Sequence, residues 1–236
     1  KETEAARDSY RSSQKEFLEK YARAKSEFHK HVVGLDYLFD VFFAVIVGRG
    51  HLAIQASPGM GKTTAITALA QTIDAEFRKV TFDPSMQPQD LGVVPIPAEE
   101  GTATALRWKI KDGPLFQAEI FFGNEFNRTP EKVQAALLSA LEEYEFKYLG
   151  EMRPLHKFFV SVIDYNTLES AGTYGFSEAA FDRFMAAVEI PQYDLDKLCQ
   201  IVATSERKKM DPASVEIEKV LTTYELLNAS RLLYSY

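Results

Sequence analysis

A glycine-rich stretch near residue 60 constrains the fold of this chain more than any other feature. The stretch runs Ala56-Ser57-Pro58-Gly59-Met60-Gly61-Lys62-Thr63, after a short apolar run from His51 to Gln55. Behind it, apolar residues recur at helical spacing as far as Ala75. A strand, a glycine-rich turn and a helix form the context that a phosphate-binding loop requires.

Each residue type in this stretch has a role in holding phosphates. Gly59 and Gly61 would let successive backbone N–H groups face one concavity, and Lys62 would supply a cation for the outer phosphates. Thr63 would place its hydroxyl on a magnesium ion. We therefore expect a nucleotide and Mg²⁺ to bind here; the predicted binding residues are Ser57, Pro58, Gly59, Met60, Gly61, Lys62, Thr63 and Thr64.

One position departs from the usual loop pattern. That pattern opens with glycine, and here the position is Ala56, which costs little if its φ is negative. The alternative is an ordinary glycine turn beside a lysine, and the flanking strand and helix argue against it.

The composition predicts a globular chain and limits the classes of function. With 236 residues, 46% of them hydrophobic and 26% charged, the chain can bury the core of one large domain or slightly more. A net charge of −7 argues against a protein that mainly wraps nucleic acid. The single cysteine, Cys199, fits a reducing compartment, so we expect a cytoplasmic location with no membrane span. Because the chain begins with Lys1, we expect it to be a piece of a longer protein.

The N-terminal part predicts two helices. From about Ser9 to Lys30 a densely charged segment carries one apolar stripe, so it either packs on the surface through that stripe or serves as a docking arm for a neighbour. Gly34 ends this segment, and an apolar helix follows from Tyr37 to Val47.

Five short apolar runs, separated by helical or long connecting segments, predict an α/β fold with a mainly parallel five-stranded sheet flanked by helices. The runs are His51 to Gln55, Lys79 to Phe82, Ile120 to Gly123, Phe158 to Asp164 and Ala186 to Ile190. Alternating segments also predict two inserted hairpins, one between Gln87 and Phe116 and one from Tyr144 to His156 about Gly150.

The third run ends in the polar residues that a nucleotide hydrolase requires. Such an enzyme needs a carboxylate to hold magnesium and a base to orient water at the end of a buried strand. Asn124 stands where an aspartate is expected, and Glu125 is the candidate for the residue that polarises the water. A hydrogen bond to a charged acceptor is worth roughly 1.5 to 3 kcal/mol, against about 1 for a neutral one, so Asn124 should weaken magnesium binding several-fold. A trap that binds ATP without hydrolysing it is therefore an open alternative.

A series of short motifs follows along the chain: Gly34-Leu35-Asp36, the loop from Pro58 to Thr63, Gly113-Pro114-Leu115-Phe116, Asn124-Glu125-Phe126-Asn127-Arg128, Val133 to Glu143, Asn166, Gly172-Thr173-Tyr174 and Phe181-Asp182-Arg183-Phe184. In these motifs, their order and their spacing, the chain from about Val32 to Pro191 resembles the MoxR branch of the AAA+ ATPases.

The resemblance implies roles for several residues. Val33 and Gly34 would contact adenine, and Asn166 would be the sensor that helps to place the attacking water. Arg183 would be an arginine finger supplied to a neighbouring subunit's nucleotide, with a surface ion pair as the alternative. Such proteins work as rings, commonly hexamers, with ATP or ADP and Mg²⁺ as ligands, and the usual partner carries a von Willebrand A domain.

The same resemblance predicts the organisation of the chain. We expect a charged helical segment over 1–30, the ATPase core over 31–191 and part of a helical lid over 192–236. Thr167 and Gly175-Phe176 stand where the family has proline. The predicted function is an oligomeric ATPase that remodels or assembles protein complexes; a hydrolysis-impaired scaffold and, less favoured by charge, a nucleic-acid motor are the alternatives.

Overall fold

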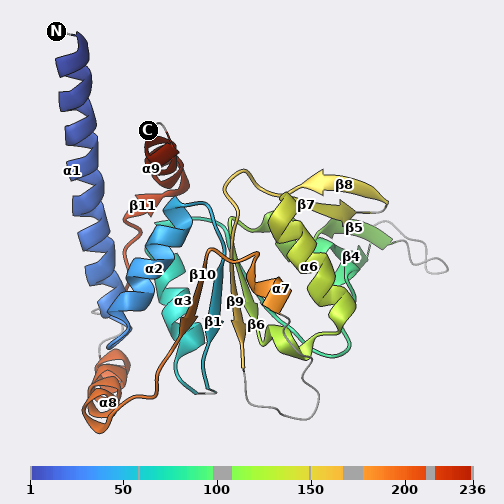
Figure 1. Ribbon diagram of the computed structural model, residues 1–236. Helices are drawn as coiled ribbons and strands as arrows, with labels where there is room; N and C mark the ends of the chain where they lie inside the picture. Colours follow the sequence, from blue (N-terminus) through green and yellow to red (C-terminus); the bar gives the residue numbers. More distant parts are fainter. Residues whose placement is uncertain are drawn as a thin grey trace. The chain divides into compact units, whose positions relative to one another are not determined.

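The computed structural model describes residues 2–57, 59–97, 108–148, 150–166, 178–210 and 216–234 (Figure 1). The chain divides into two compact units. A helical unit comprises Lys1–Gly48, Gly59–Ala75 and Pro191–Tyr236, and a sheet unit comprises Arg49–Pro58 and Glu76–Ile190. The predicted phosphate loop therefore belongs to the helical unit from Gly59 onward, and the strand that leads into it belongs to the sheet unit.

The sheet unit contains the predicted five-stranded sheet. Its order is β10-β1-β9-β6-β3, and every neighbouring pair is parallel. The inner strands β1, β6 and β9 are almost wholly buried, which explains why they read as continuous apolar runs. The α/β fold with a five-stranded parallel sheet is thus confirmed; the strands are β1 (Leu52–Gln55), β3 (Phe77–Thr81), β6 (Ile120–Asn124), β9 (Val160–Tyr165) and β10 (Ala186–Glu189).

The core of the sheet unit lies beneath helix α6 (Glu131–Glu143). Val133, Leu137 and Leu141 form the buried stripe of this helix, in one cluster with Phe121 of β6 and Phe159. Burial of apolar surface stabilises the folded state by about 25 cal/mol per Å², and this free energy holds the helix on the sheet. Short helical segments complete the unit: α4 (Gln89–Gly92), α5 (Pro114–Gln117), η1 (Phe126–Arg128) and α7 (Glu178–Phe181).

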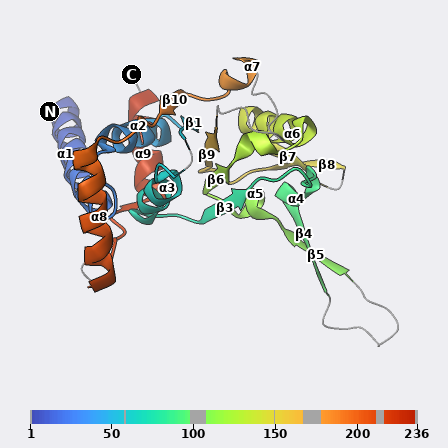
Figure 2. The ribbon, with the colours of Figure 1, turned by 90° about the horizontal axis from the view of Figure 1, so that it is seen from below.

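Both predicted hairpins are present. The first pairs β4 (Val93–Pro97) with β5 (Trp108–Asp112), and Figure 2 shows it extending away from the strands of the sheet; residues 98–107 lie outside the described part of the chain. The second pairs β7 (Glu145–Tyr148) with β8 (Glu151–Pro154).

Arg153 joins the second hairpin to the first. Its two terminal nitrogens donate to the Asp112 carboxylate at 2.9 and 3.2 Å, and its guanidinium lies 4.3 Å from the centre of the Phe116 ring. The hydrogen bond from Arg153 lowers the pKa of Asp112. This forked geometry fixes both distance and angle, so the two hairpins form one connected structure.

His51, just before β1, is a buried polar residue held by two hydrogen bonds. Its Nε2 lies 2.9 Å from the Leu141 carbonyl, and its Nδ1 accepts the Ser161 N–H at 3.1 Å. These partners require a neutral ring with the proton on Nε2, because a proton on Nδ1 would face another donor. Burial, the larger effect, lowers the pKa of His51 from 6.5 to about 4.

We expect His51 to make the protein acid-sensitive. Its pKa is lower in the folded protein than in the unfolded chain, so the unfolded chain binds the extra proton and stability falls between about pH 6.5 and pH 4. From pH 7 to pH 5 the loss should be about 2 kcal/mol. Chemical unfolding at both pH values should show this loss in the unsubstituted chain and not in His51→Gln, which does not titrate. Equal losses in the two proteins would assign the acid sensitivity to other groups.

In the helical unit, helix α1 (Glu2–His29) packs on α2 (Asp36–Val47) through the stripe predicted from the sequence. The ring centres of Tyr21 and Phe28 lie 5.5 and 5.3 Å from that of Phe39, and Phe28 is fully buried. This contact supports the interpretation of α1 as a helix packed through its apolar stripe. The other helices are α3 (Lys62–Gln71), α8 (Leu195–Met210) and α9 (Thr223–Tyr234). None of the helices within the described residues is long and apolar enough to span a membrane.

The helix after the loop is shorter than the sequence predicts. It ends at Gln71 rather than continuing to Ala75, because Ile73–Asp74 form the short strand β2, paired in parallel with β11 (Leu221–Thr222). The Thr72 hydroxyl donates to the Leu69 carbonyl at 2.7 Å, which satisfies a carbonyl of the last turn. Ile73 has helical spacing, but it is buried as a strand residue.

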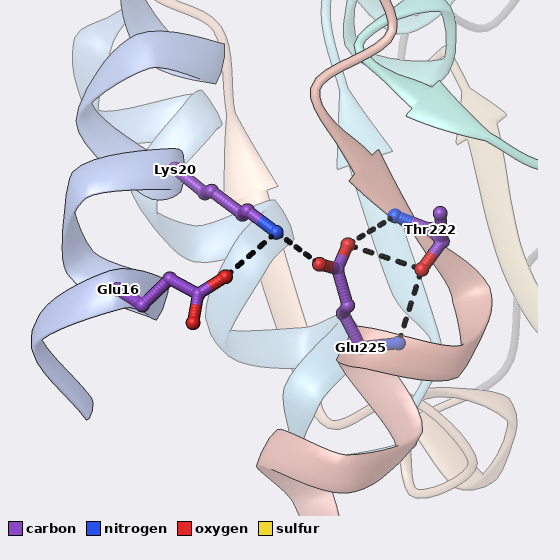
Figure 3. Close-up of polar contacts among 4 residues, drawn as sticks. All are labelled: Glu16, Lys20, Thr222 and Glu225. Atoms are coloured by element: carbon purple, nitrogen blue, oxygen red, sulfur yellow. Dashed lines mark hydrogen bonds and ion pairs between the residues drawn. The ribbon is translucent and has the colours of Figure 1, made fainter. Parts of the chain in front are cut away.

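A small polar network joins α1 to α9 within the helical unit. Figure 3 shows Lys20 of α1 between Glu16, at 3.1 Å, and Glu225 of α9. Glu225 also accepts the Thr222 N–H at 2.9 Å, and its own N–H donates to the Thr222 hydroxyl at 3.3 Å, a capping box that starts α9. The hydrogen bond to Glu225, and then that to Glu16, raises the pKa of Lys20.

Candidate functional site

The glycines of the loop adopt the backbone conformation that the motif needs. Gly59 has φ 80° and Gly61 has φ 74°, in the left-handed region that favours glycine. A Cβ at either position would meet nothing within 4 Å. Glycine is therefore favoured here by the positive φ and not by a lack of room for a side chain. Gly61 directly precedes α3, whose first turn carries Lys62, Thr63 and Thr64. The N-terminus of a helix favours an anion, because the N–H groups of its first turn point along the axis toward it.

The remaining loop residues flank these glycines on both sides. Met60, Lys62 and Thr63 are half-buried, and Thr64 is exposed. In the sheet unit, Ala56 is buried and Ser57 is half-buried. Pro58 lies outside the described residues.

Two contacts connect the predicted nucleotide residues to the segment after Pro191. The Tyr193 hydroxyl donates to the Met60 carbonyl at 3.2 Å, and burial raises the pKa of this phenol. Gly34 has φ 73°, and a Cβ there would lie 3.2 Å from the Lys197 side chain; Val33 beside it is half-buried. Tyr193 was not among the residues predicted from the sequence, since a lone tyrosine carries no pattern that marks a loop contact.

The carboxyl end of β6 carries the predicted catalytic carboxylate. Asn124 is the last strand residue, and Glu125 has φ 61° and ψ 41°, a left-handed conformation that is uncommon for a residue with a side chain. The Glu125 N–H donates to the Asp164 carboxylate, and the Glu125 carboxylate lies 3.2 Å from Nε of Arg128. Such strained conformations persist where the surroundings fix them, and they concentrate at functional sites.

Asn127 connects the ends of β6 and β9. Its side-chain amide donates to the Asn166 carbonyl at 2.7 Å, and its side-chain oxygen accepts the Asn166 N–H at 3.3 Å. The structure therefore brings Glu125 and Asn166 to one edge of the sheet, the carboxyl edge, where parallel α/β sheets bind their ligands. Asn127 was not among the site residues predicted from the sequence.

Arg183 lies at the opposite edge of the same sheet. It comes before the first residue of β10, and Met185 N donates to the carbonyl of His51, which precedes β1. Its Nε donates to the Glu142 carboxylate at 3.2 Å, and the Arg183 side chain is 33% exposed. Arg183 also lines a cavity of about 530 Å³ together with His51, Glu142 and Tyr144. Arg183 is therefore not brought together with Glu125 and Asn166.

Asp164 is a functional candidate that the sequence analysis counted only as strand. It is completely buried in β9 and accepts the Glu125 N–H. The signal in the sequence that could have identified Asp164 is its charge, which is unusual in a largely apolar strand. Among the described residues no group of three or more His, Cys, Asp or Glu side chains is arranged to hold a metal. Mg²⁺ bound with a nucleotide needs only one or two carboxylates plus phosphates, so the residues at this edge suit it.

Comparisons with known proteins point to one family. A model described as "ATPase family associated with various cellular activities (AAA)" matches residues 51–186, more than half of the chain. The uncharacterized protein YeaC of Bacillus subtilis is 29% identical over 185 residues, covering 78% of this chain and 56% of YeaC. The chaperone MoxR1 of Mycobacterium tuberculosis is 26% identical over 212 residues, covering 89% of this chain and 53% of MoxR1.

A solved structure agrees with these relatives. The crystal structure of a candidate ATPase from Cytophaga hutchinsonii matches with a TM-score of 0.81 and 25% identity, covering 96% of this chain and 67% of that one. The chain spans about half the length of the curated relatives it matches.

Proposed function

The chain belongs to the ATPase family associated with various cellular activities (AAA) and is related to MoxR proteins, and on this premise we propose that it hydrolyses Mg-ATP between the subunits of an oligomeric ring. A hexamer is the ring size that the family resemblance implies. The work done would be chaperone-like remodelling or assembly of protein complexes, because the relative MoxR1 is named a chaperone.

The observation that carries this proposal is the placement of Arg183. Glu125 and Asn166 follow the carboxyl ends of β6 and β9, whereas Arg183 precedes the amino end of β10 in the same parallel sheet. Within the sheet, an arginine at the amino edge is remote from Glu125 and Asn166 at the carboxyl edge. We therefore assign Arg183 to the nucleotide of a second copy, as a ring of identical subunits would allow.

The proposed roles follow from the chemistry of the side chains. The loop from Ser57 to Thr64 would bind the phosphates, with Lys62 as the mobile cation, and Val33 and Gly34 would contact adenine. Glu125 would accept a hydrogen bond from the attacking water and Asn166 would orient it. Magnesium, held through Thr63 and Asn124, would neutralise charge on the phosphates.

The broader assignments are proposals of the same kind. We propose a helical segment over 1–30, an ATPase core over 31–191 and a partial lid over 192–236, with a protein carrying a von Willebrand A domain as the partner. The two hairpins joined by Arg153 and Asp112 match the inserted hairpins expected from the family.

Asn124 favours one second candidate, a scaffold that binds ATP without hydrolysing it. The amide lacks the negative charge that the family's pattern places at the end of this strand. In that case nucleotide would control assembly, and turnover would be absent.

The test is ATP turnover with Mg²⁺ at rising protein concentration, for the unsubstituted chain and for Asn124→Asp. We expect turnover per subunit of the unsubstituted chain to rise with concentration, because each site is completed by a neighbour's Arg183. Turnover by Asn124→Asp alone would favour the scaffold. No turnover by either protein would reject hydrolysis by this chain.

A further inference from the structure

The register of the sheet places Asp164 beside Asn124. Strands β6 and β9 pair in parallel up to Gly123 and Ile163, so Asn124 and Asp164 occupy the next position on each strand. Neighbouring strands lie about 4.8 Å apart, and residues at one register position of a parallel pair point to the same face. The carboxylate and the amide are therefore neighbours on one face of the carboxyl edge.

The strand order places Asp164 on the strand next to the loop. In the sheet, β9 lies between β1 and β6, which can be followed in Figure 1. Asp164 pairs in register with Ile54 of β1, two residues before Ala56 opens the loop. Asn124 is one strand farther away, with Thr81 of β3 as its other partner. A carboxylate on β9 is thus one strand nearer to the loop strand than a carboxylate at position 124 would be.

Asp164 is completely buried, and its carboxylate accepts a hydrogen bond from the N–H of Glu125. Burying a carboxylate costs free energy, which hydrogen bonds and nearby positive charge offset. A divalent cation beside it would supply opposite charge, which the amide of Asn124 cannot attract as strongly. The same carboxylate accepts the N–H of Glu125, whose backbone is left-handed, so it connects the proposed metal position to the proposed catalytic residue.

We propose that Asp164 supplies, from the neighbouring strand, the carboxylate for the magnesium of the bound nucleotide that Asn124 lacks. This assignment rests on the proposed function. It would explain how an ATPase can carry asparagine at position 124, because the negative charge stands on the neighbouring strand instead.

The test measures the Mg²⁺ concentration that half-maximally tightens binding of a fluorescent ATP analogue, which requires no hydrolysis. In Asp164→Asn the required Mg²⁺ should rise at least about tenfold, as for other residues that orient a metal's ligands. Binding without Mg²⁺ should be unchanged. The exchanged variant Asn124→Asp/Asp164→Asn should recover most of the Mg²⁺ effect, because it restores one carboxylate to the pair.

Controls separate charge from folding. Asparagine at 164 still offers an oxygen to the Glu125 N–H, so thermal unfolding should show a folded protein. Asp112→Asn, which removes a carboxylate that pairs with Arg153 in the hairpins, should keep the Mg²⁺ dependence of the unsubstituted chain. If Asp164→Asn does not fold, Asn124→Asp decides the question. If the Mg²⁺ concentration that Asn124→Asp requires changes by less than about threefold, Asp164 already supplies the carboxylate of the site. A second carboxylate beside it would add little, because two neighbouring negative charges repel each other.

The outcomes distinguish this inference from the proposed function. Unchanged Mg²⁺ dependence in Asp164→Asn, or a tenfold gain in Asn124→Asp, would overturn the role of Asp164 and leave ATP binding intact. Absence of ATP binding by the unsubstituted chain would reject the proposed function and this inference together.

Discussion

The Lys62→Ala variant is expected to lose ATP binding, with a rise in Kd of at least about a hundredfold, equivalent to about 2.7 kcal/mol. Lys62 is the first residue of α3, directly after the left-handed Gly61, at the helix end that favours negative charge. Its ammonium would be the mobile charge on the outer phosphates, and charge-assisted bonds to phosphate are among the strongest polar contacts in proteins. Titration of a fluorescent ATP analogue measures the loss.

The control for Lys62→Ala is a lysine elsewhere on the surface. Lys15→Ala removes the same charge from an exposed position of α1 and should leave Kd unchanged. Alanine is the best helix former, so α3 should remain intact in Lys62→Ala and thermal unfolding should confirm it. Micromolar binding retained by Lys62→Ala would disprove the assignment of this stretch as a phosphate loop.

The Arg183→Ala variant is expected to bind ATP normally but to lose its concentration-dependent hydrolysis, by about a thousandfold or more. The guanidinium would stabilise charge that develops on a neighbouring subunit's nucleotide during hydrolysis, and it is not among the residues proposed to bind ATP. Turnover at several protein concentrations, with Kd measured in parallel, separates the two effects.

A mixing experiment tests whether Arg183 acts between chains. Lys62→Ala has an intact Arg183 and Arg183→Ala has an intact loop, so combining the two inactive proteins should restore part of the turnover. Glu142→Gln removes the ion-pair partner of Arg183 without removing the arginine, and it should remain active. Unchanged turnover in Arg183→Ala would show that the finger is another residue, and failure of the mixture would place its action within one chain.

The parts of this fold that local chemistry determines could be predicted from the sequence. Gly59 and Gly61 predict a turn with positive φ angles, and both residues have a positive φ. Buried parallel strands need uninterrupted apolar residues, and β1, β6 and β9 were recognisable for that reason. Gly150, with φ 95°, marks the turn of the second hairpin.

The parts that depend on strand order and register could not be predicted. Asp164 gains its significance only because β9 lies between β1 and β6, which no spacing along the chain reveals. The end of α3 was placed too late because a two-residue strand such as β2 has no periodicity of its own, and its partner β11 is distant in sequence. The position of Arg183 at the amino edge likewise follows from the topology.

The helical unit is assembled from three separate stretches of chain, and this sets an order for folding during synthesis. Every strand of the five-stranded sheet has been made once the ribosome has passed Glu189. At that moment β2 still lacks β11, and Lys20 still lacks Glu225. Since domains tend to fold as their residues emerge, the sheet can form first. The helix that begins with Lys62 acquires its full support only afterwards, so a nascent chain should gain its phosphate loop late.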